Sequence, residues 1–399
     1  MRIASRLNRI KPSPSSMGRQ RARELREVGR DIISLTTGEP DFDTPQHVQE
    51  AATRAMAEGH TKYTDPGGMP ELKEAIRDKL KRENALDYAL DEIVVSTGAK
   101  QVIFNAIMST VEKDDEVIVP APYWVSYPDV ARLAGGEPVF VDCSRESGFK
   151  LLPAQLERAI TPRTRWLMLN APNNPSGAFY TRTELKALTD VLLRHPHVAL
   201  MSDDIYEHIR YDGRDFVTAL QVEPALRERT LVVNGVSKAY AMTGWRIGYG
   251  AGPAPLIRAM ITLQSQSTSN PCSISQVASI TALTGPQASV LQNTAIFEER
   301  RDRVVDALNA IPGIASHSPE GAFYAFPSCE QLLGTRTAAG KVIETSDDFV
   351  LHLLDAQNLA ALPGSVYGVE GHFRISFATS MEVLEEGCAR IARACAELK

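Results

Sequence analysis

Between residues 92 and 251 the chain alternates short apolar runs with longer segments in which apolar residues recur every three or four positions. Apolar runs of this length predict buried strands, and the periodic segments between them predict helices. Two clear helical segments are residues 100–111 and 183–194. Repeated strand–helix units predict a largely parallel sheet with helices on both faces. The strand candidates are residues 93–96, 116–120, 137–141, 166–170, 198–202, 230–234 and 247–251.

The two ends of the chain carry a different pattern. A basic helix (16–29), a short strand (31–38) and a helix from Thr44-Pro45 to Gly59 are expected at the N-terminus, the last from a cap residue followed by proline. The C-terminal part predicts a long charged helix (296–310), short strands (321–326, 359–362, 372–377) and a final helix from Met381. We therefore expect an α/β protein with a large domain, 46–288, and a smaller α+β domain built from 1–45 and 289–399.

Composition excludes several classes of function. The chain has 399 residues and a net charge of -6, which argues against a nucleic-acid binder. It contains no apolar run of about eighteen residues, so no membrane span is expected. The N-terminus has no signal-peptide hydrophobic region. Its five cysteines are scattered without a CxxC pair, which favours free thiols in a reducing cytoplasm over disulfides or a metal site.

The segment SKAYAMTGWRIGYG, residues 237–250, holds a lysine in an apolar setting. A lone lysine is usually a solvated surface residue, but Lys238 lies between a strand candidate and a glycine-rich apolar stretch. Burial or a nearby cation lowers the pKa of a lysine and makes it a nucleophile or an imine partner. Ser237 and Arg246 add a hydroxyl and a guanidinium, which suit phosphate oxygens. Pyridoxal phosphate needs this combination.

The segment MSDDIYEH, residues 201–208, follows an apolar strand candidate. That strand delivers Asp203 to the carboxyl edge of the sheet, where ligand sites of α/β proteins form. A carboxylate there can keep a pyridine nitrogen protonated, although a helix cap is the competing interpretation. Tyr206 can donate its hydroxyl to the phenolic oxygen of the same ring, or it is a half-buried core residue.

Two further strand ends offer polar groups. The turn NAPNNPSG, residues 170–177, can present the amide of Asn174 to the phenolic oxygen, although such a turn alone is a weak signal. STGAKQ, residues 96–101, closes a strand and opens a helix. Because backbone amides at a helix N-terminus bind anions, the turn at Gly98, Ala99 and Lys100 can hold a phosphate.

An aromatic and a cationic residue complete the candidate site. Trp124 can stack on a planar heteroaromatic ring, and a core tryptophan is the equal alternative. Arg374 lies inside an otherwise apolar strand, FRISFATS. A buried arginine requires an anion, so it either forks onto a substrate carboxylate or forms an internal salt bridge.

These segments together resemble the class I aminotransferases of fold type I, and most of all the bacterial branch of aspartate aminotransferases, some of which also transaminate prephenate. The resemblance runs from KPS at Lys11 through LTTGEPDFDTP, KYTDPGG, GAKQ, PYWVSYP, NAPNNPSG, SDDIYEH, SKAYAMTGWRIGYG and GAFY to FRISFATS. It implies pyridoxal 5'-phosphate as cofactor, an active site shared across a homodimer, and ping-pong transfer of an amino group from L-aspartate or glutamate to 2-oxoglutarate or another 2-oxo acid.

The resemblance also implies a role for each matching residue. Lys238 carries the cofactor as a Schiff base and moves the proton. Asp203 pairs with the pyridine nitrogen, Tyr206 and Asn174 bind the phenolic oxygen, and Trp124 stacks on the ring. The phosphate is held by Ser237, Arg246 and the Ala99–Lys100 turn, with Tyr63 reaching in from a second subunit. The substrate α-carboxylate is received by Arg374, Asn174 and the backbone of Gly38.

Substrate choice follows less directly. In this branch a lysine at the position of Lys100 faces the distal carboxylate, assisted by small hydroxyls near the chain start, for which Ser15 or Ser16 is available beside Pro14. Relatives active on prephenate carry a lysine at the position of Lys11, but relatives without that activity carry it too. A β-lyase or an aromatic or broad-specificity aminotransferase is an alternative within the same chemistry.

Two alternatives belong to other classes of protein. A non-catalytic sensor with an aminotransferase-like domain needs a helix-turn-helix, for which we expect no room before the first motif. A dinucleotide-binding oxidoreductase needs a GxGxxG motif, and GYGAG at Gly248 has the wrong spacing.

Overall fold

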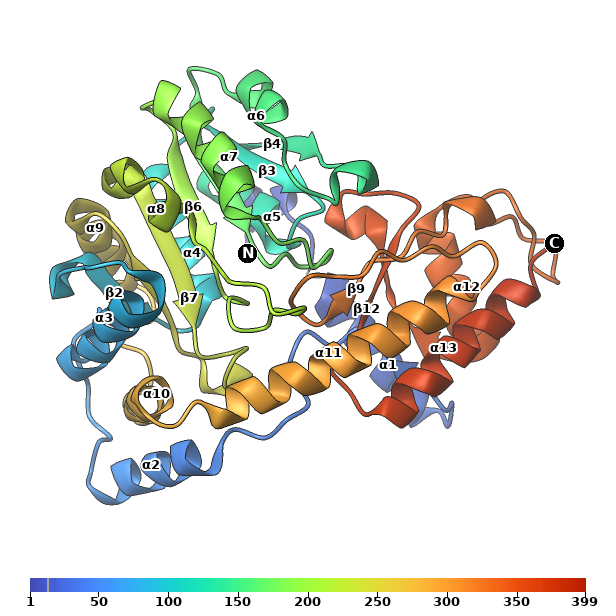
Figure 1. The fold of residues 1–399 in the computed structure, drawn as a ribbon, viewed down its shortest axis with the longest axis horizontal. Coiled ribbons are helices and arrows are strands. Elements are labelled where there is room, and N and C mark those ends of the chain that lie inside the picture. Colours follow the sequence, from blue (N-terminus) through green and yellow to red (C-terminus); the bar gives the residue numbers. More distant parts are fainter. Residues whose placement is uncertain (13) are drawn as a thin grey trace.

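The computed structural model describes residues 1–12 and 14–399, without the side chains of residues 14–19. A seven-stranded sheet of order β2-β8-β7-β6-β5-β3-β4 forms its larger part (Figure 1). As the sequence predicts, this sheet is mostly parallel, but β8 runs antiparallel to both β2 and β7. The strands are β2 (Ile93–Ser96), β3 (Glu116–Ala121), β4 (Glu137–Asp142), β5 (Thr164–Asn170), β6 (Ala199–Asp203), β7 (Thr230–Gly235) and β8 (Gly248–Ala251).

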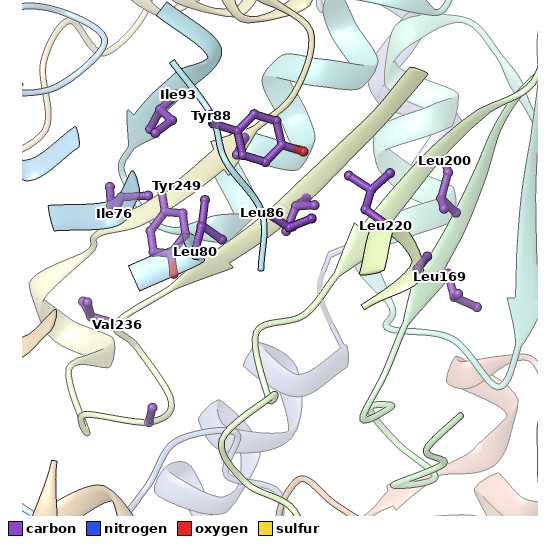
Figure 2. Packing of buried hydrophobic residues seen from close by; sticks show 14 of the residues in the cluster. Ile76, Leu80, Leu86, Tyr88, Ile93, Leu169, Leu200, Leu220, Val236 and Tyr249 are labelled. Carbon is purple, nitrogen blue, oxygen red and sulfur yellow. The ribbon is translucent and has the colours of Figure 1, made fainter. Parts of the chain in front are cut away.

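Alternate residues of these strands pack into two different hydrophobic clusters, one on each face of the sheet. Ile93 and Val232 pack into one cluster, whereas their strand neighbours Val94 and Val233 pack into the other. This is the burial expected when both faces of a sheet are covered. Figure 2 shows part of the first cluster. The helices that cover this face of the sheet are α2 (Gln46–Ala57), α3 (Pro70–Asn84), α6 (Pro153–Ala159), α7 (Arg182–Arg194), α8 (Ala219–Val222) and α10 (Ser273–Thr284).

The opposite face is covered by α4 (Ala99–Thr110), α5 (Ser126–Ala134) and α9 (Ala254–Ser265). The sequence did not single out α9 or α10 as helices. In α10 the buried face is made largely of serine and alanine, among them Ser275, Ala278 and Ser279, so the apolar stripe of an amphipathic helix is weak.

The second part of the molecule is built around two small sheets. β1 (Ile33–Ser34) pairs in parallel with β10 (Leu359–Ala360), which brings the N-terminal segment beside the C-terminal one. β12 (Phe373–Ser376) is the middle strand of an antiparallel sheet with β9 (Tyr324–Ala325) and β11 (Leu362–Pro363). The helices α1 (Pro14–Glu27), α12 (Ser346–Gln357) and α13 (Met381–Ala396) belong to this part.

Several of these strands are shorter than the sequence predicts. The segment expected as one strand over 31–38 pairs only at Ile33 and Ser34, and 359–362 divides between two sheets. Leu35 still bonds to the backbone of Ala360 and Ser376, whereas the carbonyl groups of Thr36 and Gly38 accept from the side chains of Arg374 and Lys238. Hydrogen bonds to side chains of the pocket thus replace strand pairing in this segment earlier than the apolar pattern alone indicates.

A single long helix, α11 (Ala288–Asn309), joins the two parts (Figure 1). It begins eight residues earlier than the charged segment 296–310 predicts. Val290 in its first turn packs into the cluster beneath the large sheet, whereas Phe297, Val304 and Leu308 pack into the core of the small part. The early start is explained by this double burial, which the charged segment does not reveal.

Across residues 1–12 and 14–399, no helix combines the length and the apolar character that crossing a bilayer requires.

Candidate active site

A pocket opens where the carboxyl ends of β5, β6 and β7 meet the N-terminus of α4 and the small sheet. This is the edge at which open α/β sheets bind ligands. Residues far apart in the sequence, from Gly38 to Arg374, line it together. Of the residues that the sequence singles out, the pocket contains Gly38, Ala99, Lys100, Trp124, Asn174, Asp203, Tyr206, Ser237, Lys238, Arg246 and Arg374.

Lys238 lies three residues beyond the end of β7. Its Nζ donates to the carbonyl oxygen of Gly38, which comes from the N-terminal segment. Removal from bulk water lowers the pKa of Lys238 to about 8; attraction to Glu39 opposes this shift, and repulsion by Arg374 and Arg246 adds to it. With that pKa roughly a tenth of the amine is neutral at pH 7, far more than for an exposed lysine. Lys238 is therefore suited to act as a nucleophile or a base.

Asp203 ends β6 and is buried at the floor of the pocket. The Tyr127 hydroxyl donates to its Oδ2 at 2.5 Å, and Asn170 Nδ2 donates to its carbonyl oxygen at 2.9 Å. Burial raises the pKa of Asp203 to about 6, although the hydrogen bond from Tyr127 and the charge of Lys238 both lower it. A carboxylate held in this way is a ready partner for a cationic ring nitrogen.

Arg374 lies in the middle of β12 with 2% of its surface exposed. Its NH1 donates to Asn174 Oδ1 at 3.0 Å, and its NH2 donates to the Thr36 carbonyl at 2.7 Å. Its Nε has no hydrogen-bond partner among the described residues, and none of their carboxylates forms an ion pair with the Arg374 guanidinium. A buried guanidinium without a counter-charge is costly, so an anionic ligand fits this position better than an internal salt bridge.

The N-terminus of α4 forms the opposite end of the pocket. Gly98 precedes the helix with φ +84°, and a Cβ there would lie 2.3 Å from Arg246 NH2. A Cβ on Gly248 would lie 2.0 Å from the backbone nitrogen of Ala99. Glycine at both positions lets the Arg246 guanidinium and the helix N-terminus approach each other. With Ser237 also lining the pocket, this end offers the donors that a phosphate group requires.

Trp124 also lines the pocket. Its ring stands edge-on to Tyr127 at a centroid distance of 5.4 Å, and Lys100 Nζ lies 4.8 Å from the centroid of its ring. Trp124 lines the pocket and is only partly buried, so its ring borders the space that a ligand would occupy.

Two residues that the sequence singles out lie elsewhere. Tyr63 is in the loop between α2 and α3 with 92% of its surface exposed, and it does not line the pocket of its own chain. Lys11 is also exposed and outside the pocket lining. The side chains of Ser15 and Ser16 lie outside the described residues, so the suggestion that they assist substrate binding stays a prediction.

Among the pocket residues to which the sequence assigns no role are Glu39, Tyr127, Asn170 and Tyr324. Tyr127 follows Trp124 at the helical spacing of three, and Asn170 ends a strand, so a weak signal existed for both. Tyr324 stands in an apolar strand, where a tyrosine is indistinguishable from a core residue.

A sheet of this topology with such a pocket at its carboxyl edge defines the fold type I class of α/β enzymes. The family model for class I and II aminotransferases matches residues 30–391. The chain is 55% identical to a probable aspartate/prephenate aminotransferase of Rickettsia bellii, with 99% of each chain covered. The crystal structure of the aspartate aminotransferase from Rhizobium meliloti matches with a TM-score of 0.98 and 54% identity over 100% of both chains.

The aspartate aminotransferase from Thermus thermophilus with maleate gives a TM-score of 0.92 at 43% identity, over 99% of this chain and 100% of that one. The chain therefore belongs to the class I and II aminotransferases, which depend on pyridoxal phosphate.

Proposed function

We propose that this chain binds pyridoxal 5'-phosphate at Lys238 and transfers the amino group of L-aspartate or L-glutamate to 2-oxoglutarate or another 2-oxo acid. The observation that carries the proposal is the meeting of three groups in one pocket. Lys238 has a pKa lowered to about 8, Asp203 is a buried carboxylate, and Arg374 is a buried cation without a carboxylate partner among the described residues.

The pocket fits the cofactor end by end. Asp203 would hold the pyridine nitrogen, Tyr206 and Asn174 the phenolic oxygen, and Trp124 the ring face. The helix N-terminus at Ala99–Lys100, with Ser237 and Arg246, would hold the phosphate. When bound, the cofactor supplies an electron sink for the bond broken at the substrate α-carbon.

The protein's own groups bind, orient and move a proton. The Arg374 fork, with the Asn174 amide and the Gly38 backbone, would receive the substrate α-carboxylate and fix the direction of the α-carbon. Lys238 Nζ would accept the proton from that carbon and return it during transfer of the amino group, as a general base and then a general acid. Its hydrogen bond to the Gly38 carbonyl holds the amine beside the carboxylate subsite.

A dicarboxylic substrate is favoured by the cationic wall of the pocket and by the relatives. Lys100 and Arg374 both line the pocket, so two carboxylates can each meet a cation. The Thermus thermophilus relative was solved with maleate, a dicarboxylate, and the Rickettsia bellii relative is named for aspartate and prephenate. Prephenate is the alternative amino acceptor, with Lys11 as the residue to test, whereas Ser15 or Ser16 would assist Lys100 at the distal carboxylate.

A visible spectrum tests the cofactor and the donor together. The purified protein with pyridoxal phosphate should develop an imine band that L-aspartate bleaches, and borohydride should fix the cofactor's mass to the peptide carrying Lys238. Lys238→Ala should lose the band, the adduct and turnover, whereas Lys113→Ala, at an exposed surface lysine, should keep all three. Unchanged turnover of Lys238→Ala with L-aspartate and 2-oxoglutarate would refute the proposal.

The assembly belongs to the same proposal. A homodimer would let the exposed Tyr63 of one subunit complete the phosphate site of the other. Mixing Tyr63→Ala subunits with Lys238→Ala subunits should then restore part of the activity, because each hybrid dimer contains one intact pocket. No recovery in a mixture shown to contain hybrid dimers would refute the sharing.

The division into domains and the compartment are also proposals. The clusters of the large sheet lie mostly within residues 46–288, and the cluster of the small part lies mostly within 1–45 and 289–399, which supports a large and a small domain with these bounds. The five free cysteines support a reducing cytoplasm. Limited proteolysis that cuts near residues 45 and 289 first would support this division.

A further inference from the structure

Tyr324 contacts both Tyr206, which is proposed to bind the cofactor, and Arg374, which is proposed to bind the substrate carboxylate. It is not itself one of the proposed binding residues. It lies on β9, where it pairs with Ser376 of β12, two residues from Arg374. It is 1% exposed and lines the pocket. Its hydroxyl is 2.9 Å from that of Tyr206, and the Arg374 guanidinium carbon lies 4.4 Å from the centroid of its ring.

We propose that Tyr324 is a positioning residue with two separable parts. Its hydroxyl directs the proton of Tyr206 into the pocket, and its ring supports the Arg374 guanidinium from below. This inference rests on the proposed function, because Tyr206 is taken to bind the phenolic oxygen of the cofactor.

The first part follows from counting protons. A phenol donates one hydrogen bond, and the two tyrosine hydroxyls share the single bond between them. If Tyr206 donates to Tyr324, it has no proton left for a ligand. If Tyr324 donates to Tyr206, the Tyr206 proton is free to point at an acceptor in the pocket. An anionic phenolic oxygen beside Tyr206 selects the second arrangement.

The surroundings of Tyr324 favour the same direction. The Arg374 guanidinium lies over the Tyr324 ring, and its charge lowers the pKa of Tyr324 against the effect of burial, which makes the Tyr324 hydroxyl a better donor. A bond donated to the Tyr206 oxygen in turn strengthens the bond that Tyr206 donates onward. Tyr206 then stabilises the anionic form of the phenolic oxygen more strongly than it would beside a phenylalanine.

The second part follows from the position of the ring. The Arg374 guanidinium packs against the rings of Tyr324 and Tyr367, at 4.4 and 5.4 Å from their centroids. A desolvated cation over aromatic faces is held in place as well as stabilised. Phenylalanine at position 324 keeps this face, whereas leucine removes it.

The two parts predict different defects in two variants. In Tyr324→Phe loaded with cofactor, the pH midpoint of the change in the visible imine band should rise by about 0.5 to 1 unit, because the phenolate loses part of its support. Binding of maleate to the loaded enzyme should change less than twofold. In Tyr324→Leu the midpoint should rise similarly, and maleate should bind at least about fivefold more weakly.

Tyr88→Phe is the matched control. Tyr88 is a buried tyrosine outside the pocket lining, and its hydroxyl has no hydrogen-bond partner among the described residues. Its loss should leave both the spectral midpoint and maleate binding unchanged. Circular dichroism of each variant separates these effects from misfolding, and Tyr324→Phe keeps nearly the full side-chain volume if the leucine variant fails to fold.

Each outcome decides between the two proposals. A wild-type protein that develops no imine band with pyridoxal phosphate overturns the proposed function and this inference with it. A Tyr324→Phe protein with a normal band and an unshifted midpoint overturns the hydroxyl part while the proposed function stands. Equal loss of maleate binding in the phenylalanine and leucine variants overturns the division between hydroxyl and ring.

Discussion

Replacing Lys79 should cause a large and pH-dependent loss of stability. Lys79 lies on α3, and its ammonium group donates to Glu207 and, at 2.8 Å, to Asn84 Oδ1. The side chains of Lys79 and Glu207 are only 1% and 4% exposed. Asn84 and Asn234 donate to the two oxygens of Glu207 at 2.8 and 2.7 Å. The pair thus ties α3, β7 and the turn after β6 together.

The magnitude follows from leaving one buried charge behind. Burial alone would raise the pKa of Glu207, but attraction to Lys79 and His208 and hydrogen bonds from Lys79 and Asn84 keep it below the usual value. Removing one partner of a buried pair costs about 3–5 kcal/mol. For a unit of 150–250 residues, each kcal/mol shifts the melting temperature by roughly 2–4 °C. Lys79→Met should therefore melt roughly 6–20 °C below the wild type at pH 7.5.

Changing both partners should recover much of the loss. Lys79→Met combined with Glu207→Gln removes both charges and keeps an oxygen for one of the two asparagines. The double variant should be more stable than the sum of the single losses by about 2–3 kcal/mol. Calorimetric melting at one scan rate and one protein and cofactor concentration measures this coupling.

Acid should narrow the difference between Lys79→Met and the wild type. In the wild type the lowered pKa of Glu207 contributes stability that is present above its ordinary value of 4.5 and is lost as the pH falls. In Lys79→Met burial raises that pKa, so the variant gains relative stability as Glu207 takes up a proton. A deficit below about 1 kcal/mol at pH 7.5, or one that is the same at pH 5, would refute this reasoning.

Three further predictions concern the site and the acid stability. Arg374→Lys should raise the KM for L-aspartate about 10- to 100-fold, because a lysine cannot form two parallel hydrogen bonds to a carboxylate. Initial rates measure this KM, and Arg303→Lys, at an exposed arginine, is the control. Pyridoxal phosphate should bind the cofactor-free protein more weakly below pH 6, where Asp203 takes up a proton, and calorimetry should show that Asp203→Asn removes this part of the pH dependence. Burial lowers the pKa of His317 and His372, and the charge of Arg145 adds to this shift. The stability that the two neutral imidazoles contribute above pH 6.5 should therefore be lost as the pH falls. The variant with glutamine at both positions should show a smaller fall in melting temperature between pH 7 and pH 5.

Strand ends in the large sheet were predictable because two signals coincide there. A buried strand is an apolar run, and a polar residue at its end has to be solvated or functional, as at Asp203. The direction of β8 was not predictable, because a four-residue apolar run has no direction. The lower limit of α11 was missed because its first turn packs against a different core from the rest of the helix.

The residues of the candidate site also differ in how well the sequence predicts them. Lys238 and Arg374 stand out because a charge inside an apolar segment needs a partner. Tyr127 and Tyr324 do not, because an aromatic residue among apolar neighbours looks like ordinary core. Their partners, Asp203 and Tyr206, lie 76 and 118 positions away in the sequence, so only the folded chain brings them together.

The charges around Lys238 link substrate binding to its basicity. Arg374 and Arg246 both lower the pKa of the amine, whereas Glu39 and Asp203 raise it. A carboxylate bound to Arg374 would cancel the largest of the two repulsions. Once the substrate amine has displaced Lys238 from the cofactor, the pKa of the freed lysine amine would therefore be higher, which would make it a stronger proton acceptor beside the α-carbon. In the cofactor-free chain the lysine amine is thus removed from water and partly neutral, and the affinity of the freed amine for a proton would increase when an anion occupies the neighbouring subsite.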